Sequence, residues 1–210
     1  MEPILKDIYQ NILDGQNTGM EAKVREALES GIFPKTILEE GMIAAMTEVG
    51  RLFEVGEFYV PEMLVSARAM QTGLNVLKPH LKEANVQAAG KVAIGTVKGD
   101  LHDIGKNLVA MLLEGAGLEI LDLGVDVSPE KFVVAADSVD VIALSALLMT
   151  TMPGMKDIIS SLQAAGKCDK VKVIIGGAPV TQAYAESIGA DGYASNASRA
   201  VTMTKALLGK

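Results

Sequence analysis

The pattern of apolar residues changes near residue 90, and this change constrains the fold more than any other feature of the chain. Residues 1–82 have apolar side chains three to four positions apart and almost no strand-like segment. From Lys91 onward, short apolar runs alternate with amphipathic helical stretches, which is typical of a parallel sheet wound by helices. We therefore predict an α/β chain with a helical domain at 1–88 and a sheet domain at 89–210.

Glycine and proline residues divide both parts of the chain into elements. In the first part we expect a small four-helix bundle, with helices near 2–13, 20–30, 35–53 and 60–81. In the second part we expect strands near 91–97, 118–123, 140–145, 171–176 and 191–194. The helices between and after them are expected near 105–116, 129–138, 153–165, 180–188 and 196–208. Five strands in about 120 residues fit a flavodoxin-like, Rossmann-like parallel sheet better than a longer dinucleotide-binding fold.

The composition excludes several kinds of binding chemistry. The net charge is -7, and an acidic chain is a poor partner for a phosphate backbone, so we expect no nucleic-acid binding. The single cysteine, Cys168, excludes an internal disulfide, a cysteine-ligated zinc site and a protein-ligated iron–sulfur cluster. Any bound metal is therefore expected to arrive within a cofactor.

The hydrophobic content also bears on location and packing. No apolar run is long enough to span a bilayer, and residues 1–6 lack the basic-then-apolar order of a secretory signal. We therefore expect a cytoplasmic protein that does not bind membranes. Because the chain has 11 methionines and no tryptophan, apolar contacts must come from aliphatic and thioether side chains.

The loop after the first expected strand carries one of only two histidines in the chain. Residues 100–105 read Asp-Leu-His-Asp-Ile-Gly and follow the apolar run Val92–Val97. Open α/β sheets bind ligands at the carboxyl ends of their strands. A loop imidazole at His102, with a carboxylate at Asp100, is typical of a metal ligand and its orienting partner. A loop histidine that is only hydrogen-bonded remains the simpler alternative.

Three further loops are expected at the same edge of the sheet as the histidine loop. Gly176 and Gly177 lack β-carbons, so a ligand can approach the backbone closely there. Ser145, Thr150 and Thr151 offer hydroxyl groups without charge. Together with the turn at 194–197, these loops predict a slot for a bulky, mostly neutral ligand. Taken alone, a glycine pair after a strand is as often a tight turn.

The combination of these motifs resembles a known family over the whole chain. The family's motifs are Asp-x-His-x-x-Gly, Ser-x-Leu and Gly-Gly, found here as Asp100, His102 and Gly105, then Ser145 and Leu147, then Gly176 and Gly177. The chain is similar to the cobalamin-binding region of methionine synthase and to the corrinoid proteins of methyltransferase systems. The implied cofactor is cobalamin or a related corrinoid, as methylcobalamin and cob(I)alamin.

The resemblance implies roles for residues of the sheet domain. His102 would replace the corrinoid's own dimethylbenzimidazole as the axial ligand to cobalt. Asp100 would accept a hydrogen bond from the other ring nitrogen, and Thr151 stands where the family's relay ends in a serine. The nucleotide tail of the corrinoid would lie beside Ser145 and Gly176. Further cofactor-binding positions are implied at Gly99, Leu101, Asp103, Gly105, Leu147, Met149, Thr150, Gly177 and Ala197.

In the helical domain, the resemblance implies a cap over the upper face of the corrin. Its apolar contacts correspond to Phe53, Val60 and Met63, with Glu39 near the corrin edge. Without the resemblance, Phe53 and Met63 would be interpreted as core residues.

The resemblance implies a methyl carrier that is not an enzyme by itself. One substrate-specific methyltransferase would load the corrinoid, and a second would pass the methyl group to tetrahydrofolate or a thiol. A reductive activase is the third implied partner. Methanol, methylamines, methylated betaines and methoxylated aromatics all remain open as methyl donors.

Other functions fit the sequence less well. A cobalamin-dependent sensor is the main alternative, although related light-sensing repressors carry an added basic DNA-binding region. The small subunit of a carbon-skeleton mutase shares the histidine motif, but mutases cover the corrin with a barrel. A receiver domain would need an aspartate where the third strand ends in Ala143, Leu144 and Ser145. A flavin site would need aromatic side chains in these loops.

Overall fold

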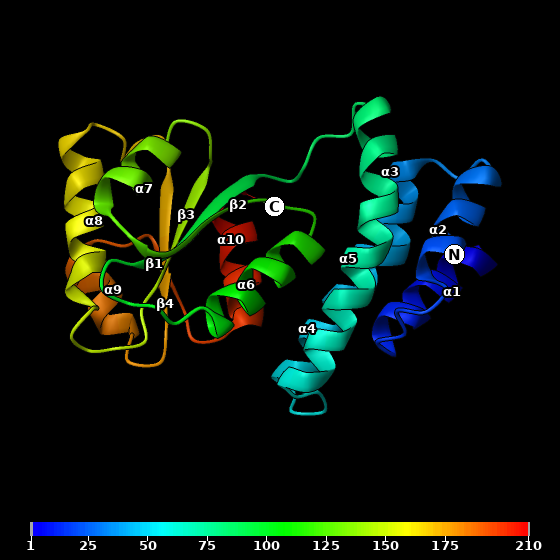
Figure 1. Cartoon of the computed structure of the whole chain (residues 1–210), viewed down its shortest axis with the longest axis horizontal. Helices are drawn as coiled ribbons and strands as arrows, with labels where there is room; N and C mark the ends of the chain where they lie inside the picture. Colours follow the sequence, from blue (N-terminus) through cyan, green and yellow to red (C-terminus); the bar gives the residue numbers. More distant parts are fainter. Residues whose placement is uncertain (1, 210) are drawn as a thin grey trace. The chain divides into compact units, whose positions relative to one another are not determined.

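The computed structural model describes residues 2–209, which form two compact units (Figure 1). The helical unit contains the described residues up to Ala88 together with Gly115–Gly117. The sheet unit contains Ala89–Glu114 and residues 118–209. Among the described helices, none is both long enough and apolar enough to cross a membrane.

The helical unit follows the helices that the apolar periodicity predicts. Its elements are α1 (Pro3–Leu13), α2 (Met20–Glu29), α3 (Pro34–Thr36), η1 (Ile37–Ile43), α4 (Ala44–Glu54) and α5 (Val60–Glu83). Prolines stand in the first turns of α1, α3 and α5, where a backbone N–H has no partner within the helix. At the start of α5, the Glu62 carboxylate accepts a hydrogen bond from the Tyr59 N–H at 2.9 Å.

The third predicted helix contains a π-helical segment that the periodicity did not predict. Helices α3 and α4 are joined without a break by η1, whose seven residues have the wider π turn. Gly41 lies in η1, and a β-carbon added there would come within 3.3 Å of Ile8 Cγ2 on α1. The small residue therefore lets η1 pack closely against α1.

Methionine side chains fill much of the core of the helical unit. Met20, Met42, Met63 and Met70 are each at most 1% exposed. In this unit the buried hydrophobic side chains are aliphatic or thioether groups, whereas the core of the sheet unit includes Phe132.

The sheet unit is a parallel α/β sheet wound by helices, as predicted. Within the described residues its strands are β1 (Lys91–Val97), β2 (Glu119–Val127), β3 (Val141–Ser145), β4 (Lys172–Gly176) and β5 (Gly192–Ala194). Its helices are α6 (Ile104–Gly115), α7 (Pro129–Ala135), α8 (Pro153–Ala164), α9 (Gln182–Ile188) and α10 (Ala197–Leu207). The strand order is β2-β1-β3-β4-β5, with every pair parallel, which confirms the flavodoxin-like order.

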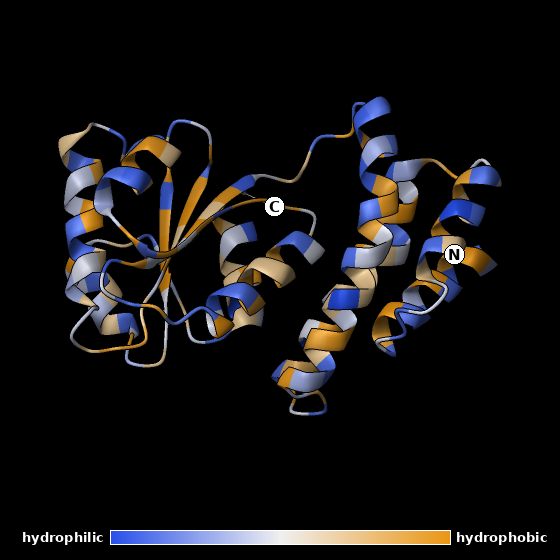
Figure 2. Ribbon diagram, viewed as in Figure 1, coloured by the Kyte–Doolittle hydropathy of each residue, from blue (hydrophilic) through white to orange (hydrophobic). Residues whose placement is uncertain are grey.

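Helices cover both faces of this sheet (Figure 1). On one face Phe132 and Ile158, from α7 and α8, pack with strand residues such as Ile142. On the other face Leu113 of α6 packs with strand residues such as Ile94. Because both faces are covered, the inner strands are mostly apolar, and Figure 2 draws much of their length in orange.

Strand β2 extends further than the sequence predicts. The expected strand ended at residue 123, but β2 continues to Val127. Its pairing with β1 shifts twice, because Ile94 and Gly95 pair with Asp122 and Gly124, and Val97 then pairs with Val127. Each shift adds one residue to β2, as in a β-bulge. Aspartate and glycine are rare inside strands, so the predicted strand ended too early.

Candidate functional site

The site is centred on a close pair formed by His102 and Asp100 in the loop between β1 and α6. His102 Nδ1 lies 2.7 Å from Asp100 Oδ1, and the same oxygen accepts a hydrogen bond from the His102 N–H at 3.1 Å. The Asp100 side chain is fully buried, whereas the His102 side chain is 52% exposed. The carboxylate therefore occupies Nδ1, and Nε2 is the nitrogen of this accessible imidazole that could bind a ligand.

The other oxygen of Asp100 is held by the loop after β3. Oδ2 accepts hydrogen bonds from the Leu147 N–H and the Thr151 hydroxyl, each at 2.8 Å. Burial alone would raise the pKa of Asp100, but the hydrogen bonds from Leu147, His102 and Thr151 outweigh it. The pKa of Asp100 is therefore held well below its ordinary value, and the group is a carboxylate at neutral pH.

A buried threonine on β1 fixes the backbone of the histidine. The Thr96 hydroxyl donates a hydrogen bond to the His102 carbonyl oxygen at 2.8 Å, and Thr96 itself is fully buried. With its N–H bonded to Asp100 as well, the His102 backbone is restrained at both of its polar groups. Thr96 was not among the predicted site residues, although a polar residue inside the apolar run Val92–Val97 is a signal that could have identified it.

The carboxyl ends of four strands lie next to one another at this edge of the sheet. Thr96 pairs with Ser145, Ser145 with Gly176, and Gly176 with Ala194. A β-carbon added to Gly176 would come within 3.0 Å of the Ala194 carbonyl oxygen. At Gly177, φ is +138° and an added β-carbon would overlap the Ala146 carbonyl oxygen, so this position requires glycine, whereas at Gly176 a β-carbon would make a tight contact.

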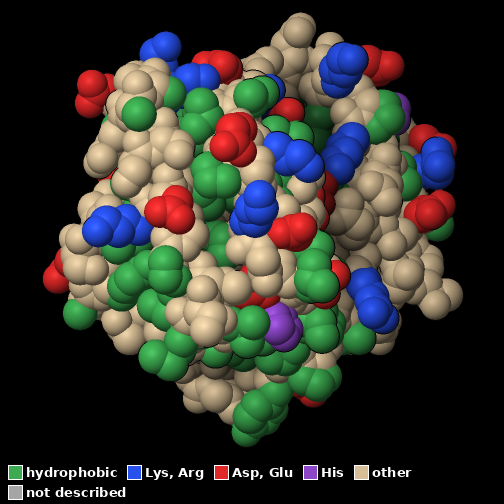
Figure 3. All heavy atoms as spheres, turned by 60° about the vertical axis from the view of Figure 1, so that its left-hand side comes forward, with side chains coloured by type: hydrophobic (Ala, Val, Ile, Leu, Met, Phe, Trp, Pro, Cys, Tyr) green, Lys and Arg blue, Asp and Glu red, His purple; other side chains and the backbone are tan. Residues whose placement is uncertain are grey.

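Large apolar side chains are exposed on the loops that flank the His102 imidazole. Leu101 and Ile104 are 72% and 80% exposed, and Met149 in the loop after β3 is 79% exposed. Leu147 and Leu148, next to Met149, are also exposed. Figure 3 shows hydrophobic side chains around a histidine on the surface of the molecule. An exposed apolar area beside an imidazole fits a large, flat ligand that carries a metal.

The remaining predicted residues of the sheet unit lie on the same loops. Gly99 has a φ of +82°, and Asp103 Oδ2 accepts a hydrogen bond from the Asn107 side-chain amide. Gly105 has open space where a β-carbon would stand. Ser145 is half-buried, Thr150 is exposed and Ala197 is buried at the start of α10. The Asp100 side chain forms hydrogen bonds with three other predicted residues, His102, Leu147 and Thr151.

The four predicted residues of the helical unit differ in exposure. Val60 is exposed and Phe53 is half-buried, so each presents some surface. Glu39 lies in η1 and forms an exposed ion pair with Lys35 at 3.7 Å. Met63 is fully buried in the core of the unit.

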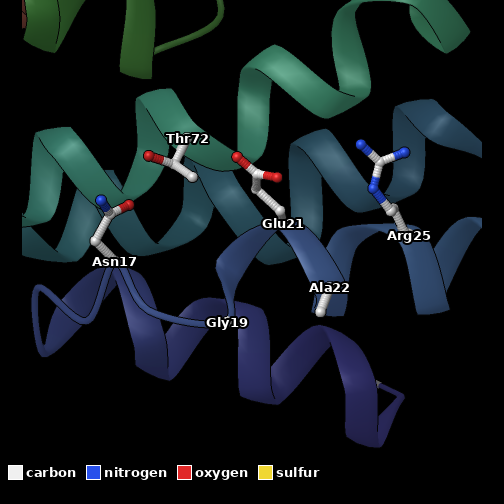
Figure 4. A pocket seen from close by; sticks show the side chains of 6 residues that line it. All are labelled: Asn17, Gly19, Glu21, Ala22, Arg25 and Thr72. Atoms are coloured by element: carbon white, nitrogen blue, oxygen red, sulfur yellow. The ribbon is translucent and has the colours of Figure 1, made fainter.

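A shallow groove in the helical unit contains none of the predicted residues. Figure 4 shows its lining, which comes from α2, α5 and the turn before α2: Asn17, Gly19, Glu21, Ala22, Arg25 and Thr72. These side chains do not include the histidine, the apolar surface or the glycine pair described above. The groove is therefore separate from the candidate site.

Comparison with known proteins identifies the family. Models described as B12 binding domain match residues 90–202 and, separately, residues 4–78. The chain is 43% identical to dimethylamine corrinoid protein 1 of Methanosarcina acetivorans, covering 99% of this chain and 98% of that protein. It is 44% identical to trimethylamine corrinoid protein 1 of the same organism, covering 87% of each chain.

Solved structures agree with the sequence relatives. The methanol:cobalamin methyltransferase complex from Methanosarcina barkeri matches with a TM-score of 0.87 and 27% identity, covering 99% of this chain and 80% of that one. A cobalamin-binding protein from Desulfitobacterium hafniense matches with a TM-score of 0.79 and 29% identity, covering 97% and 98%. The exposed imidazole, its buried carboxylate and the glycine-lined sheet edge fit such a cofactor. The chain therefore belongs to the B12-binding corrinoid proteins of methyltransferase systems, and its cofactor is cobalamin or a related corrinoid.

Proposed function

We propose that this chain carries a methyl group from a methylated amine to a second methyltransferase, with His102 as the protein ligand to cobalt. The observation that carries the proposal is the 2.7 Å contact between His102 Nδ1 and the buried carboxylate of Asp100. The corrinoid supplies the cobalt that accepts and gives up the methyl group. The chain's own residues bind the cofactor, orient the ligand and exclude water.

The role of Asp100 follows from its charge and burial. A carboxylate beside Nδ1 holds the proton on that nitrogen and keeps the lone pair on Nε2. The same contact raises the basicity of the imidazole as a metal ligand. Thr151 donates to the far oxygen of Asp100 and so supports the carboxylate in this position.

The other proposed contacts with the corrinoid are of two kinds, apolar contacts with the ring and contacts with the nucleotide tail. Leu101, Leu147 and Met149 offer exposed apolar surface for the corrin ring. Ser145, Gly176 and Gly177 lie at the sheet edge proposed for the nucleotide tail. We also place cofactor contacts at Gly99, Asp103, Gly105, Thr150 and Ala197.

We propose a protective role for the helical unit above the bound corrin. Phe53 and Val60 have exposed surface and are the better candidates for direct contact, with Glu39 at the corrin edge. Met63 is buried, so its contribution is to the packing of α5 unless that helix moves.

The names of the relatives favour a methylated amine as the methyl donor. Proteins named for dimethylamine and trimethylamine are 43% and 44% identical to this chain, whereas the methanol complex is 27% identical. We therefore propose that the loading partner is a methylamine methyltransferase. A second methyltransferase to tetrahydrofolate or a thiol, and a reductive activase, complete the proposed set of partners.

The ligand assignment is tested by spectroscopy of the full chain loaded with cobalamin. In the cob(II)alamin state, electron paramagnetic resonance should show splitting from one axial imidazole nitrogen, and growth on ¹⁵N-histidine should alter it. His102→Ala should remove this signal. His80→Ala is the matched control, because the His80 side chain is 44% exposed and lies 3.8 Å from Glu83 in the helical unit, and it should leave the signal unchanged. A signal that persists in His102→Ala would show that another nitrogen binds cobalt.

The donor assignment is tested by methyl transfer. The full chain is loaded with cobalamin and reduced to the cob(I)alamin state. It is then incubated with purified dimethylamine, trimethylamine or methanol methyltransferase and the corresponding substrate. We expect methylation with an amine methyltransferase and little with the methanol enzyme. The opposite preference would overturn the proposed donor.

A further inference from the structure

The bulged end of β2 lies beside both ends of the histidine loop. Of the residues described, Asn85 and Asp126 alone combine a side chain with a positive φ. Asp126 has a φ of +52° and follows Gly124, whose φ is +86°. Aspartate tolerates the left-handed region better than most residues, but it adopts it only where the surroundings stabilise it.

Asp126 makes two hydrogen bonds to the start of the loop. Its N–H donates to the Asp100 carbonyl oxygen at 3.0 Å. Its Oδ1 accepts from the Gly99 N–H at 2.7 Å. Asp126 therefore holds the backbone on both sides of the Asp100 α-carbon, while the Asp100 side chain holds His102.

A buried lysine ties the other end of the loop to the same strand. Lys106 Nζ lies 2.7 Å from both carboxylate oxygens of Asp122 and 2.7 Å from Asn107 Oδ1. The Lys106 side chain is only 2% exposed. Asp122 Oδ1 also accepts a hydrogen bond from the Gly124 N–H at 2.9 Å, which links the ion pair to the first bulge.

We infer that Asp126 and Asp122 on the bulged end of β2 are positioning residues that set the place of the His102 imidazole. The hydrogen bonds of these two residues go to other partners than His102, and each acts through a neighbour: Asp126 through Asp100, and Asp122 through Lys106. The inference rests on the proposed role of His102 as the cobalt ligand. Asp122 precedes the first register shift and Asp126 lies within the second. The two residues hold opposite ends of one loop, so the loop is held in place before the cofactor binds.

The first test is amide hydrogen exchange in the corrinoid-free full chain. Asp126→Gly keeps the backbone N–H and suits a positive φ, but it removes the acceptor for Gly99. Asp126→Asn is the matched control, because it keeps an acceptor oxygen and also tolerates a positive φ. We expect exchange at Gly99 and at His102 to rise about tenfold or more in Asp126→Gly and to change less than about twofold in Asp126→Asn. If the exchange rate rises at Gly99 alone, Asp126 does not position His102.

The second test is the cobalt signal of the loaded protein. In Asp126→Gly, the fraction of cob(II)alamin with an axial imidazole nitrogen should fall at least twofold, and Asp126→Asn should restore it. Asp122→Ala removes the carboxylate partner of Lys106 and keeps its hydrogen bond to Asn107. This variant should also lower the fraction of cob(II)alamin with an axial imidazole nitrogen, while amide exchange at Gly99 stays unchanged. Wild-type ligation in both Asp126→Gly and Asp122→Ala would overturn the inference. If the wild-type protein itself lacked the nitrogen signal, the proposed ligand role would fail, and the exchange experiment would still decide whether β2 positions the loop.

Discussion

Thr151 and His102 bind opposite oxygens of the same buried carboxylate. The Thr151 hydroxyl lies 2.8 Å from Asp100 Oδ2, and His102 Nδ1 lies 2.7 Å from Asp100 Oδ1. The Leu148 carbonyl oxygen is 2.9 Å from the same hydroxyl, so one hydrogen is shared between two acceptors. The threonine thus connects the loop after β3 to the histidine through a single charged group.

Replacing the Asp100 carboxylate with an amide should weaken corrinoid binding. In Asp100→Asn, the side-chain NH₂ must face either the His102 groups at Oδ1 or the donors at Oδ2, which come from Leu147, Leu148 and Thr151. Either arrangement sets donors against donors. We expect affinity for cobalamin to fall about ten- to a hundredfold. The measurement is a spectroscopic titration of the corrinoid-free chain. Asp157→Asn, on an exposed part of α8, should bind like the wild type, and equal affinity in Asp100→Asn would contradict the role of the carboxylate.

Removing the Thr151 hydroxyl should have a smaller effect than changing Asp100. Thr151→Val keeps the shape of the side chain but removes one donor to Asp100 Oδ2. We expect a loss of about 1 kcal/mol in the free energy of unfolding. The pKa of Asp100 should also rise toward its ordinary value, as measured by nuclear magnetic resonance. Thr151→Ser keeps the hydroxyl donor, so its unfolding free energy should stay close to that of the wild type. If Thr151→Ser and Thr151→Val lost similar stability, the lost packing of the threonine methyl group would be the cause and not the hydrogen bond.

The pKa of Asp100 predicts how stability depends on pH. Because the pKa is lower in the folded chain than in the unfolded chain, the unfolded state binds the proton first as the pH falls. The stabilisation from Asp100 is complete above its unfolded pKa of about 3.9 and is lost progressively below it. Urea unfolding at several pH values measures the difference in unfolding free energy between the wild type and Asp100→Asn. This difference should become smaller as the pH falls. A difference that widens would show that the sign of the shift is wrong.

Two glycines of the site should respond differently to alanine. In Gly177→Ala, the new β-carbon overlaps the Ala146 carbonyl at a φ of +138°, so we expect a loss of about 1–3 kcal/mol in unfolding free energy. Gly105 lies in α6 with open space around it, and Gly105→Ala should leave stability unchanged or raise it by up to about 1 kcal/mol. Denaturant unfolding of the corrinoid-free chain measures both. Corrinoid affinity should fall in Gly105→Ala, since Gly105 is a proposed cofactor contact and the added methyl group would fill the open space there.

The exposed apolar side chains should matter for the cofactor and not for folding. Leu101→Ser and Met149→Ser change residues that are 72% and 79% exposed, so each should alter the unfolding free energy by less than about 0.5 kcal/mol. We expect each change to weaken corrinoid binding severalfold, because the apolar surface proposed for the ring is smaller. Val134→Ser changes an exposed residue on α7 and is the matched control. Unchanged affinity in both site variants would move the proposed corrin contact elsewhere.

Local patterns predicted most of the fold. The apolar runs predicted the positions of the inner strands. Helices cover both faces of this sheet, so most residues of an inner strand are buried and therefore apolar. The prediction was wrong at the end of β2, where Asp122, Gly124 and Asp126 look like a turn but form a bulged strand. The π segment η1 was also missed, since its apolar spacing differs little from that of an α-helix.

The site was predictable only where its partners are close in sequence. His102 and Asp100 are two residues apart, so their contact follows from a single loop. Thr151 lies 51 residues from Asp100 and was assigned from the family resemblance, because spacing alone does not specify which hydroxyl reaches the carboxylate. Asp126 was missed for the same reason, since it lies 27 residues from Gly99. Thr96 lies only six residues from His102, and its signal, a polar residue inside an apolar strand, was not used.

The two backbone hydrogen bonds of His102 have a consequence for the rate of ligand exchange. Since Thr96 and Asp100 hold its carbonyl and its amide, the imidazole can reach or leave a metal only by turning about its own side-chain bonds. Rotamer changes of exposed side chains take picoseconds to nanoseconds, whereas loop rearrangements are slower. A change of metal ligation at this position should therefore need a side-chain rotation that breaks the contact between Nδ1 and Asp100, but no rearrangement of the loop backbone.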